Sequence, residues 1–149
     1  MAGPSEWERF RHIDNAEIWA TRNVGRQELV DMVRDKLGHD LLDPDVLTIG
    51  FARRFATYKR STLLLSQMER LKALLLDADR PVQFVFAGKA HPADEPGKTM
   101  IREIDRLARS ADVGHRFVFI ADYDIGIART MYHGCDCLLY TSPSPRDRS

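Results

Sequence analysis

Short continuous apolar runs alternate along the chain with longer segments in which apolar residues recur every three or four positions. A buried strand produces the first pattern and an amphipathic helix the second. We expect strands near residues 46–52, 82–87, 117–121 and 135–140, and helices near residues 60–78, 98–110 and 125–132. With right-handed crossovers, this order predicts an α/β fold, a Rossmann-like parallel sheet flanked by helices.

Residues 1–45 are predicted to form an N-terminal helical arm and linker, preceding a partial Rossmann-like domain at residues 46–140. Asp14 and Glu17 have the spacing of a capping box, which places a helix start at Asp14, and Gly38 suits the position just past the helix end. Gly25 lies inside the apolar stripe and could divide it into two helices. We expect the arm to pack on another surface and see no chemistry in it.

The last nine residues, T-S-P-S-P-R-D-R-S at positions 141–149, do not continue the pattern. Two prolines, four hydroxyl side chains and several charges suit neither a buried strand nor a cleanly started helix. We expect this tail to be disordered and to be an artefact of a sequenced fragment.

Composition narrows the possible functions. The chain has 149 residues, and its 22 Lys and Arg balance 22 Asp and Glu. Zero net charge disfavours nucleic acid and membrane surfaces as partners. No apolar run approaches the ~18 residues of a membrane span, and the start lacks a signal peptide's apolar region. The only cysteines, Cys135 and Cys137, are too few for a complete zinc site and suit small buried positions. A cytoplasmic protein with free thiols and no metal is expected.

Four cationic side chains follow the first predicted strand directly: Arg53, Arg54, Lys59 and Arg60. Open α/β sheets bind anions at the carboxyl ends of their strands and beside helix N-termini. The fixed fork of arginine suits phosphate oxygens, and lysine adds a movable point charge. No glycine-rich loop is present, so recognition would depend on side chains. The residues alone leave two interpretations open, a phosphate site and a solvated basic cluster.

Three segments together resemble one enzyme family. They are L-T-I-G-F-A-R-R-F-A-T-Y-K-R at residues 47–60, F-V-F-A-G-K-A-H-P at 84–92 and D-Y-D-I-G-I-A-R at 122–129. This set closely resembles the α-glucan (glycogen, starch and maltodextrin) phosphorylases, especially their bacterial and archaeal branch. The resemblance covers about residues 7–136, the first part of that family's C-terminal half. It implies part of a glycosyltransferase-B fold and an enzyme that cleaves terminal α-1,4-glucosidic bonds with orthophosphate to give glucose 1-phosphate.

The resemblance also implies roles for individual residues. Arg54 and Lys59 match the residues that hold the substrate orthophosphate, and they are the expected catalytic pair. Arg53 replaces the usual lysine beside the phosphate of pyridoxal 5′-phosphate, the family's cofactor, which acts through its phosphate group. Tyr123 matches a tyrosine that lines the cofactor pocket. The expected substrates of the complete enzyme are orthophosphate and an α-1,4-glucan.

Four further polar residues follow predicted strands. Lys89 and His91 come just after the second strand, where ligands bind in such sheets, but a loop histidine is more often exposed or capping, and neither residue receives a defined role. Asp122 and Asp124 could suggest a pair of acid/base carboxylates. Their spacing places them on opposite sides of an extended chain, so we do not assign them that chemistry.

The family's Schiff-base lysine lies in a Glu-Ala-Ser-Gly-Thr-type segment just past the last predicted strand, where this sequence instead runs into its tail. We expect the glucan-binding half to be absent as well. We therefore expect an inactive fragment of an enzyme whose oligomeric state, possibly a homo-oligomer, stays open. Two alternatives also stay open: a fragment of a nucleotide-sugar glucan synthase of the same fold, and a non-catalytic α/β binding module.

Overall fold

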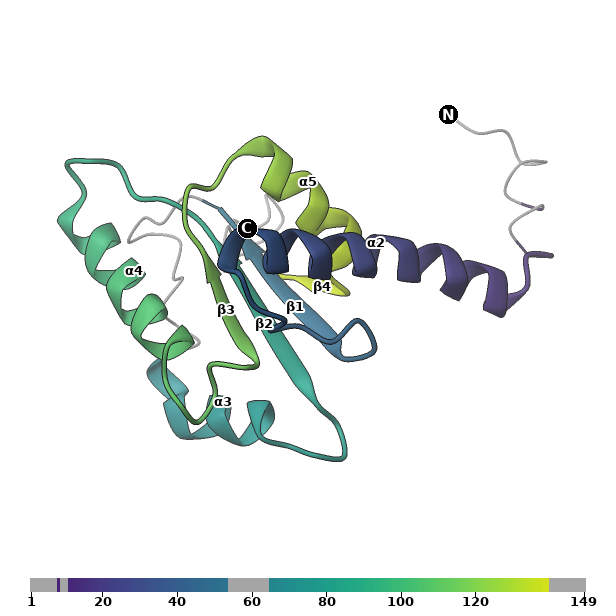
Figure 1. Ribbon diagram of the computed structural model, residues 1–149, viewed down its shortest axis with the longest axis horizontal. Coiled ribbons are helices and arrows are strands. Elements are labelled where there is room, and N and C mark those ends of the chain that lie inside the picture. Colours follow the sequence, from purple (N-terminus) through teal and green to yellow (C-terminus); the bar gives the residue numbers. More distant parts are fainter. Residues whose placement is uncertain (1–7, 9–10, 54–64, 140–149) are drawn as a thin grey trace, which may run out of the picture.

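The structure, a computed structural model, describes residue 8 and residues 11–53 and 65–139. Figure 1 shows its elements, which carry the same labels here. They are α2 (Asn15–Leu37), β1 (Leu47–Ala52), the 3₁₀ turn η2 (Leu65–Gln67), α3 (Met68–Leu75), β2 (Val82–Ala87), α4 (Glu95–Ala108), β3 (Phe117–Ile120), α5 (Ile125–Gly134) and β4 (Cys137–Leu138). The predicted tail at 141–149 lies outside the described residues.

The four strands form one sheet in the order β3-β2-β1-β4, and every neighbouring pair is parallel. Strand β1 therefore lies centrally, with β2 on one side and β4 on the other. The predicted α/β class is confirmed.

The two faces of the sheet carry different side chains. Towards α3 and α4, the sheet presents phenylalanines, and Phe86 stacks on Phe51 and Phe117 with ring centroids 5.2 and 5.1 Å apart. Towards α2 and α5 it presents smaller residues, including Ala52 and Val85. Figure 1 shows α2 and α5 side by side on this second face. Strand side chains alternate between the two faces, and helices cover both faces, so most strand residues are apolar; Thr48 and Gln83 are buried polar residues within β1 and β2.

Helix α2 is continuous through Gly25, so the possible division into two helices does not occur. Gly25 serves packing instead, because a Cβ there would lie 2.6 Å from the carbonyl oxygen of His133 in α5. The predicted ends are confirmed. Asp14 is the N-cap and accepts a hydrogen bond from the amide of Ala16, and Gly38 ends the helix with φ of 75°.

Other boundaries differ by a few residues. Helix α4 begins at Glu95 and not at residue 98, because the Asp94 side chain caps it. Helix α3 ends at Leu75, before a turn in which the Asp77 carboxylate accepts hydrogen bonds from the amides of Asp79 and Arg80. Strand β4 is shorter than predicted, because Cys135 still caps α5. Among the described residues, no helix is long and apolar enough to span a membrane.

Candidate anion site at the carboxyl edge of the sheet

The carboxyl ends of β1, β2 and β3 meet at one edge of the sheet, which we call the carboxyl edge. Arg53 follows β1, Lys89 lies two residues beyond β2, and Tyr123 lies three residues beyond β3. The chain leaves β1 for β2 on one side, and β4 is added on the other side, so the order of connection switches at β1. Ligands of open parallel sheets bind at such switch points. This position makes the exit of β1 the candidate site.

The backbone of Arg53 extends the strand ladder by one residue. Its amide donates a hydrogen bond of 3.1 Å to the carbonyl oxygen of Ala87, the last residue of β2. The preceding Phe51 is 1% exposed and is anchored in the aromatic stack. The Arg53 side chain is half-buried. A cation is thus held at the carboxyl edge by a strand whose own position is fixed by packing.

Tyr123 reaches the same strand exit from β3. Its ring is half-buried against the core beneath α2 and α5. Its hydroxyl donates a hydrogen bond of 3.4 Å to the carbonyl oxygen of Ala52, the residue before Arg53. The fold therefore brings these two predicted cofactor-binding residues to one place.

The two aspartates that flank Tyr123 have backbone roles. Asp122 has φ of 56°, the left-handed region that aspartate adopts more readily than most residues. Asp124 is the N-cap of α5, and its Oδ1 accepts a hydrogen bond of 2.8 Å from the amide of Ile127. Asp122 turns the chain at the strand end, and Asp124 starts the helix.

Of the helices in the described ranges, α4 and α5 have N-termini that carboxylates of the chain itself cap. Asp94 accepts a hydrogen bond of 2.9 Å from the amide of Gly97 in α4, as Asp124 does in α5. Helix N-termini attract anions through their free amides and their dipole. Because the aspartates occupy these positions, the N-termini of α4 and α5 do not offer free amides to an external anion.

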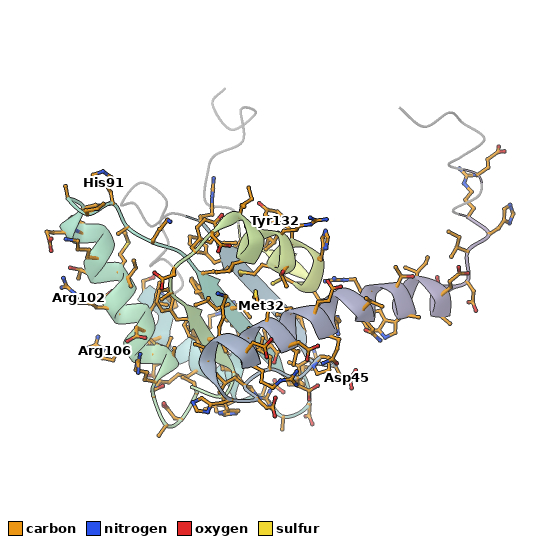
Figure 2. The ribbon with its side chains drawn as sticks, turned by 45° about the horizontal axis from the view of Figure 1, so that its top comes forward. Met32, Asp45, His91, Arg102, Arg106 and Tyr132 are labelled. Carbon is orange, nitrogen blue, oxygen red and sulfur yellow. The ribbon has the colours of Figure 1, made fainter. Side chains whose placement is uncertain are left out.

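Lys89 and His91 are both exposed in the loop between β2 and α4. His91 Nδ1 accepts a hydrogen bond of 3.2 Å from the amide of Ala93, so His91 has a local capping role. Figure 2 shows His91 beside the start of α4. The predicted catalytic residues, Arg54 and Lys59, lie outside the described residues, and so does Arg60.

A polar cluster that sequence reasoning missed joins α2 to β1 and β4. The side chain of Asp136 forms an ion pair of 2.6 Å with Arg26 and a longer one of 3.3 Å with Arg22. Its other oxygen accepts a hydrogen bond of 2.8 Å from the amide of Thr48. The signal in the sequence was a pair of arginines one helical turn apart on the buried stripe of α2, where a charge needs a partner.

Two opposing effects act on the pKa of Asp136. Burial raises the pKa. Hydrogen bonds from Arg26 and the Thr48 amide, together with the charges of Arg22 and Arg26, lower the pKa by more than burial raises it. The net result is a pKa below the ordinary value, so the carboxylate is ionised at neutral pH. The cluster is therefore a partly buried ion network, and it lies at the beginning of β1, away from the carboxyl edge.

Comparison with models of protein families finds no match. Comparison with curated proteins finds strong similarity to a glycogen phosphorylase of Mycobacterium tuberculosis, 43% identical over 91% of this chain and 18% of the relative. A glycogen phosphorylase of Aquifex aeolicus is 38% identical over 95% of this chain and 22% of the relative. A maltodextrin phosphorylase of Thermococcus litoralis is 34% identical over 96% of this chain and 18% of the relative. The chain thus spans about a fifth of the length of these relatives, and over that length it belongs to the glycogen and maltodextrin phosphorylase family.

Proposed function

We propose that this chain supplies the orthophosphate-binding edge of an α-1,4-glucan phosphorylase, which releases glucose 1-phosphate from the ends of glucan chains. The supporting observation is the meeting of Arg53 and Tyr123 at the exit of β1, in a chain 34–43% identical to named phosphorylases. The capped N-termini of α4 and α5 support a site built from cationic side chains.

In this proposal, Arg54 and Lys59 hold the substrate orthophosphate, and Arg53 faces a second phosphate group beside it. Two phosphate dianions repel each other strongly at short range, and fixed cations offset that repulsion. Arginine adds two parallel hydrogen bonds, which orient the phosphate as well as attract it. The chain's residues thereby bind and align the nucleophile.

The second phosphate group is proposed to be that of pyridoxal 5′-phosphate. The residues present fit this group in part, since Arg53 supplies a cation and Tyr123 a half-buried aromatic ring at the same strand exit. When bound, the cofactor supplies acid/base chemistry through its phosphate. A cytoplasmic location and a homo-oligomeric parent stay predictions.

Phosphate binding by this chain tests the proposal. Inorganic phosphate is titrated into the 149-residue chain and into its Arg54→Ala and Lys59→Ala variants, with calorimetry as the readout. Each variant should weaken binding by at least about tenfold, because a hydrogen bond to a charged group contributes about 1.5–3 kcal/mol. Arg106→Ala, which removes an exposed cation of α4 that Figure 2 labels, is the matched control and should leave binding unchanged.

Two outcomes would contradict parts of this proposal. Equal weakening by the Arg106 control would indicate non-specific attraction to positive charge. Tighter binding of ADP-glucose or UDP-glucose than of phosphate, lost in the Arg54 and Lys59 variants, would favour the glucan synthase alternative. We also expect no glucose 1-phosphate from maltodextrin, phosphate and cofactor with this chain alone, and detecting it would refute the predicted inactivity.

A further inference from the structure

Asp136 connects three elements that are distant in the sequence. Its Oδ1 accepts hydrogen bonds from Arg26 Nη2 at 2.6 Å and Nε at 3.2 Å, and Arg26 belongs to α2. Its Oδ2 accepts the amide of Thr48 in β1 at 2.8 Å. Its own amide donates to the Thr48 carbonyl oxygen at 2.8 Å, directly before β4 begins. One residue therefore contacts Thr48 through both its side chain and its backbone.

Burial and contacts with Pro44 and Trp19 fix the position of the Arg26 side chain. It is 4% exposed, its Nη1 donates a hydrogen bond of 2.6 Å to the Pro44 carbonyl oxygen, and its guanidinium lies 4.7 Å from the ring centroid of Trp19. One turn earlier on α2, Arg22 donates hydrogen bonds to the carbonyl oxygens of His133 and Cys135 at the end of α5. The direction from which Arg26 meets Asp136 is thus fixed by packing.

Within the part of the chain that the structure describes, strand β4 forms only a short ladder with β1. It comprises two residues, paired as Ile49 with Cys137 and Gly50 with Leu138. Beyond those pairs, the Leu139 amide donates a hydrogen bond of 2.8 Å to the Gly50 carbonyl oxygen. A strand this short gains few ladder bonds, and a slip of one residue would turn every side chain to the opposite face.

We propose that Asp136 and Arg26 are positioning residues that lock the register of β4 on β1, whose paired residues Ile49 and Gly50 lie three to four positions before Arg53. A one-residue slip would displace the carboxyl end of β4 by about 3.3 Å relative to β1. That displacement is comparable to a hydrogen-bond length, so it would alter how an anion fits at the edge. The identity of the anion rests on the proposed function, whereas the register lock does not.

Nuclear magnetic resonance on the 149-residue chain tests this proposal with Asp136→Asn, Arg26→Met and their double variant. Two readouts need no ligand: hydrogen exchange of the Leu139 amide, and the chemical shift of the Arg53 amide. A third readout is the dissociation constant for inorganic phosphate. Asp136→Asn should speed Leu139 exchange at least tenfold beyond the change in global unfolding, shift the Arg53 amide and weaken phosphate binding severalfold. The double variant should be little worse than either single variant, because both act on one interaction.

A matched control separates positioning from general stability. Ile104→Val removes a methylene from the core beneath the opposite face of the sheet, where Ile104 is 0% exposed. It should lower global stability while leaving the Leu139 exchange, corrected for unfolding, and the Arg53 shift unchanged. Arg26→Lys, which keeps the charge but loses the fork, should give an intermediate effect and tests the same point if Asp136→Asn folds poorly.

The outcomes divide clearly. If Leu139 exchange and the Arg53 shift change as little in Asp136→Asn and Arg26→Lys as in Ile104→Val, then the pair is merely structural and the proposal is overturned. If the unaltered chain binds no phosphate, the proposed function fails, and the two amide readouts still decide whether Asp136 locks the register.

Discussion

The hydroxyl of Tyr123 lies 3.4 Å from the carbonyl oxygen of Ala52 and donates a hydrogen bond to it, which links the loop after β3 to the exit of β1. This distance is at the long end for such a bond, so its contribution should be near the lower limit of the usual range. Tyr123→Phe is expected to lower the free energy of unfolding by about 0.5 kcal/mol in urea titrations. A loss of more than ~1.5 kcal/mol would indicate a second partner for the hydroxyl.

Replacing Gly25 with alanine should have two effects of opposite sign on the stability of the chain. Replacing a mid-helix glycine with alanine stabilises a free helix by about 1 kcal/mol. Here the new Cβ would lie 2.6 Å from the backbone oxygen of His133, so α2 and α5 would have to separate. Overpacking of this kind costs about 1–3 kcal/mol or more, and Gly25→Ala is therefore expected to be net destabilising in thermal unfolding. Glu28→Ala, exposed on the same helix, should stay within about 0.5 kcal/mol of the parent chain.

Much of the fold could be predicted from the sequence because its causes are local. The apolar runs marked the strands, and Asp14 and Gly38 marked the ends of α2, since caps and left-handed residues have local signatures. The role of Gly25 was missed because it depends on α5, more than 100 residues later in the chain. Arg26 and Asp136 are 110 residues apart, so no spacing rule connects them. Long-range partners of buried charges emerge only from the folded arrangement.

Substitutions at Asp122 test whether the backbone is strained at the carboxyl edge. Its φ of 56° costs a β-branched residue more than aspartate, whose side chain tolerates this region. Asp122→Val is expected to destabilise the chain by about 1–2 kcal/mol in urea unfolding. Asp122→Gly should stay within about 0.5 kcal/mol, because relief of strain is offset by a more flexible unfolded chain. Ala121→Val, its exposed neighbour outside the left-handed region, is the control, and an equal loss there would exclude strain as the cause.

The Asp136 cluster predicts acid sensitivity. The pKa of Asp136 in the folded chain lies below 3.8, since hydrogen bonds from Arg26 and Thr48 outweigh the effect of burial. A depressed folded pKa contributes stability that is present above the unfolded pKa and is lost as pH falls through the folded value. Urea midpoints should therefore fall as the pH drops below about 4. The urea midpoint of Asp136→Asn should be lower than that of the parent chain at neutral pH, and it should fall less as the pH drops below about 4. Parallel curves for both proteins would show that other carboxylates control acid unfolding.

The two cysteines should differ sharply in reactivity. Burial raises the pKa of the Cys135 thiol to about 12, and the nearby Asp136 charge acts in the same direction. Cys137 is exposed, so the prediction of a buried position is confirmed for Cys135 and wrong for Cys137. Since the thiolate is the reactive form, a disulfide reagent at about pH 8 should modify one thiol quickly and the other only as fast as the chain unfolds. Cys137→Ser should abolish the fast phase, and urea should make both thiols react together in the parent chain. Because the folded pKa of Cys135 is raised from 9.0, stability should also decline as pH rises above 9 towards 12.

Gly25 is a point at which the backbone of α2 comes close to α5, and the helix could pivot there. About ten residues separate Gly25 from Asn15, a length of ~15 Å at the helical rise, so a tilt of ~10° at Gly25 would swing the start of the helix by ~2.6 Å. Figure 1 shows this half of α2 projecting beyond α5. The direction of α2 between Asn15 and Gly25 therefore depends on the contact between two helix backbones, and a methyl group added at Gly25 would change it.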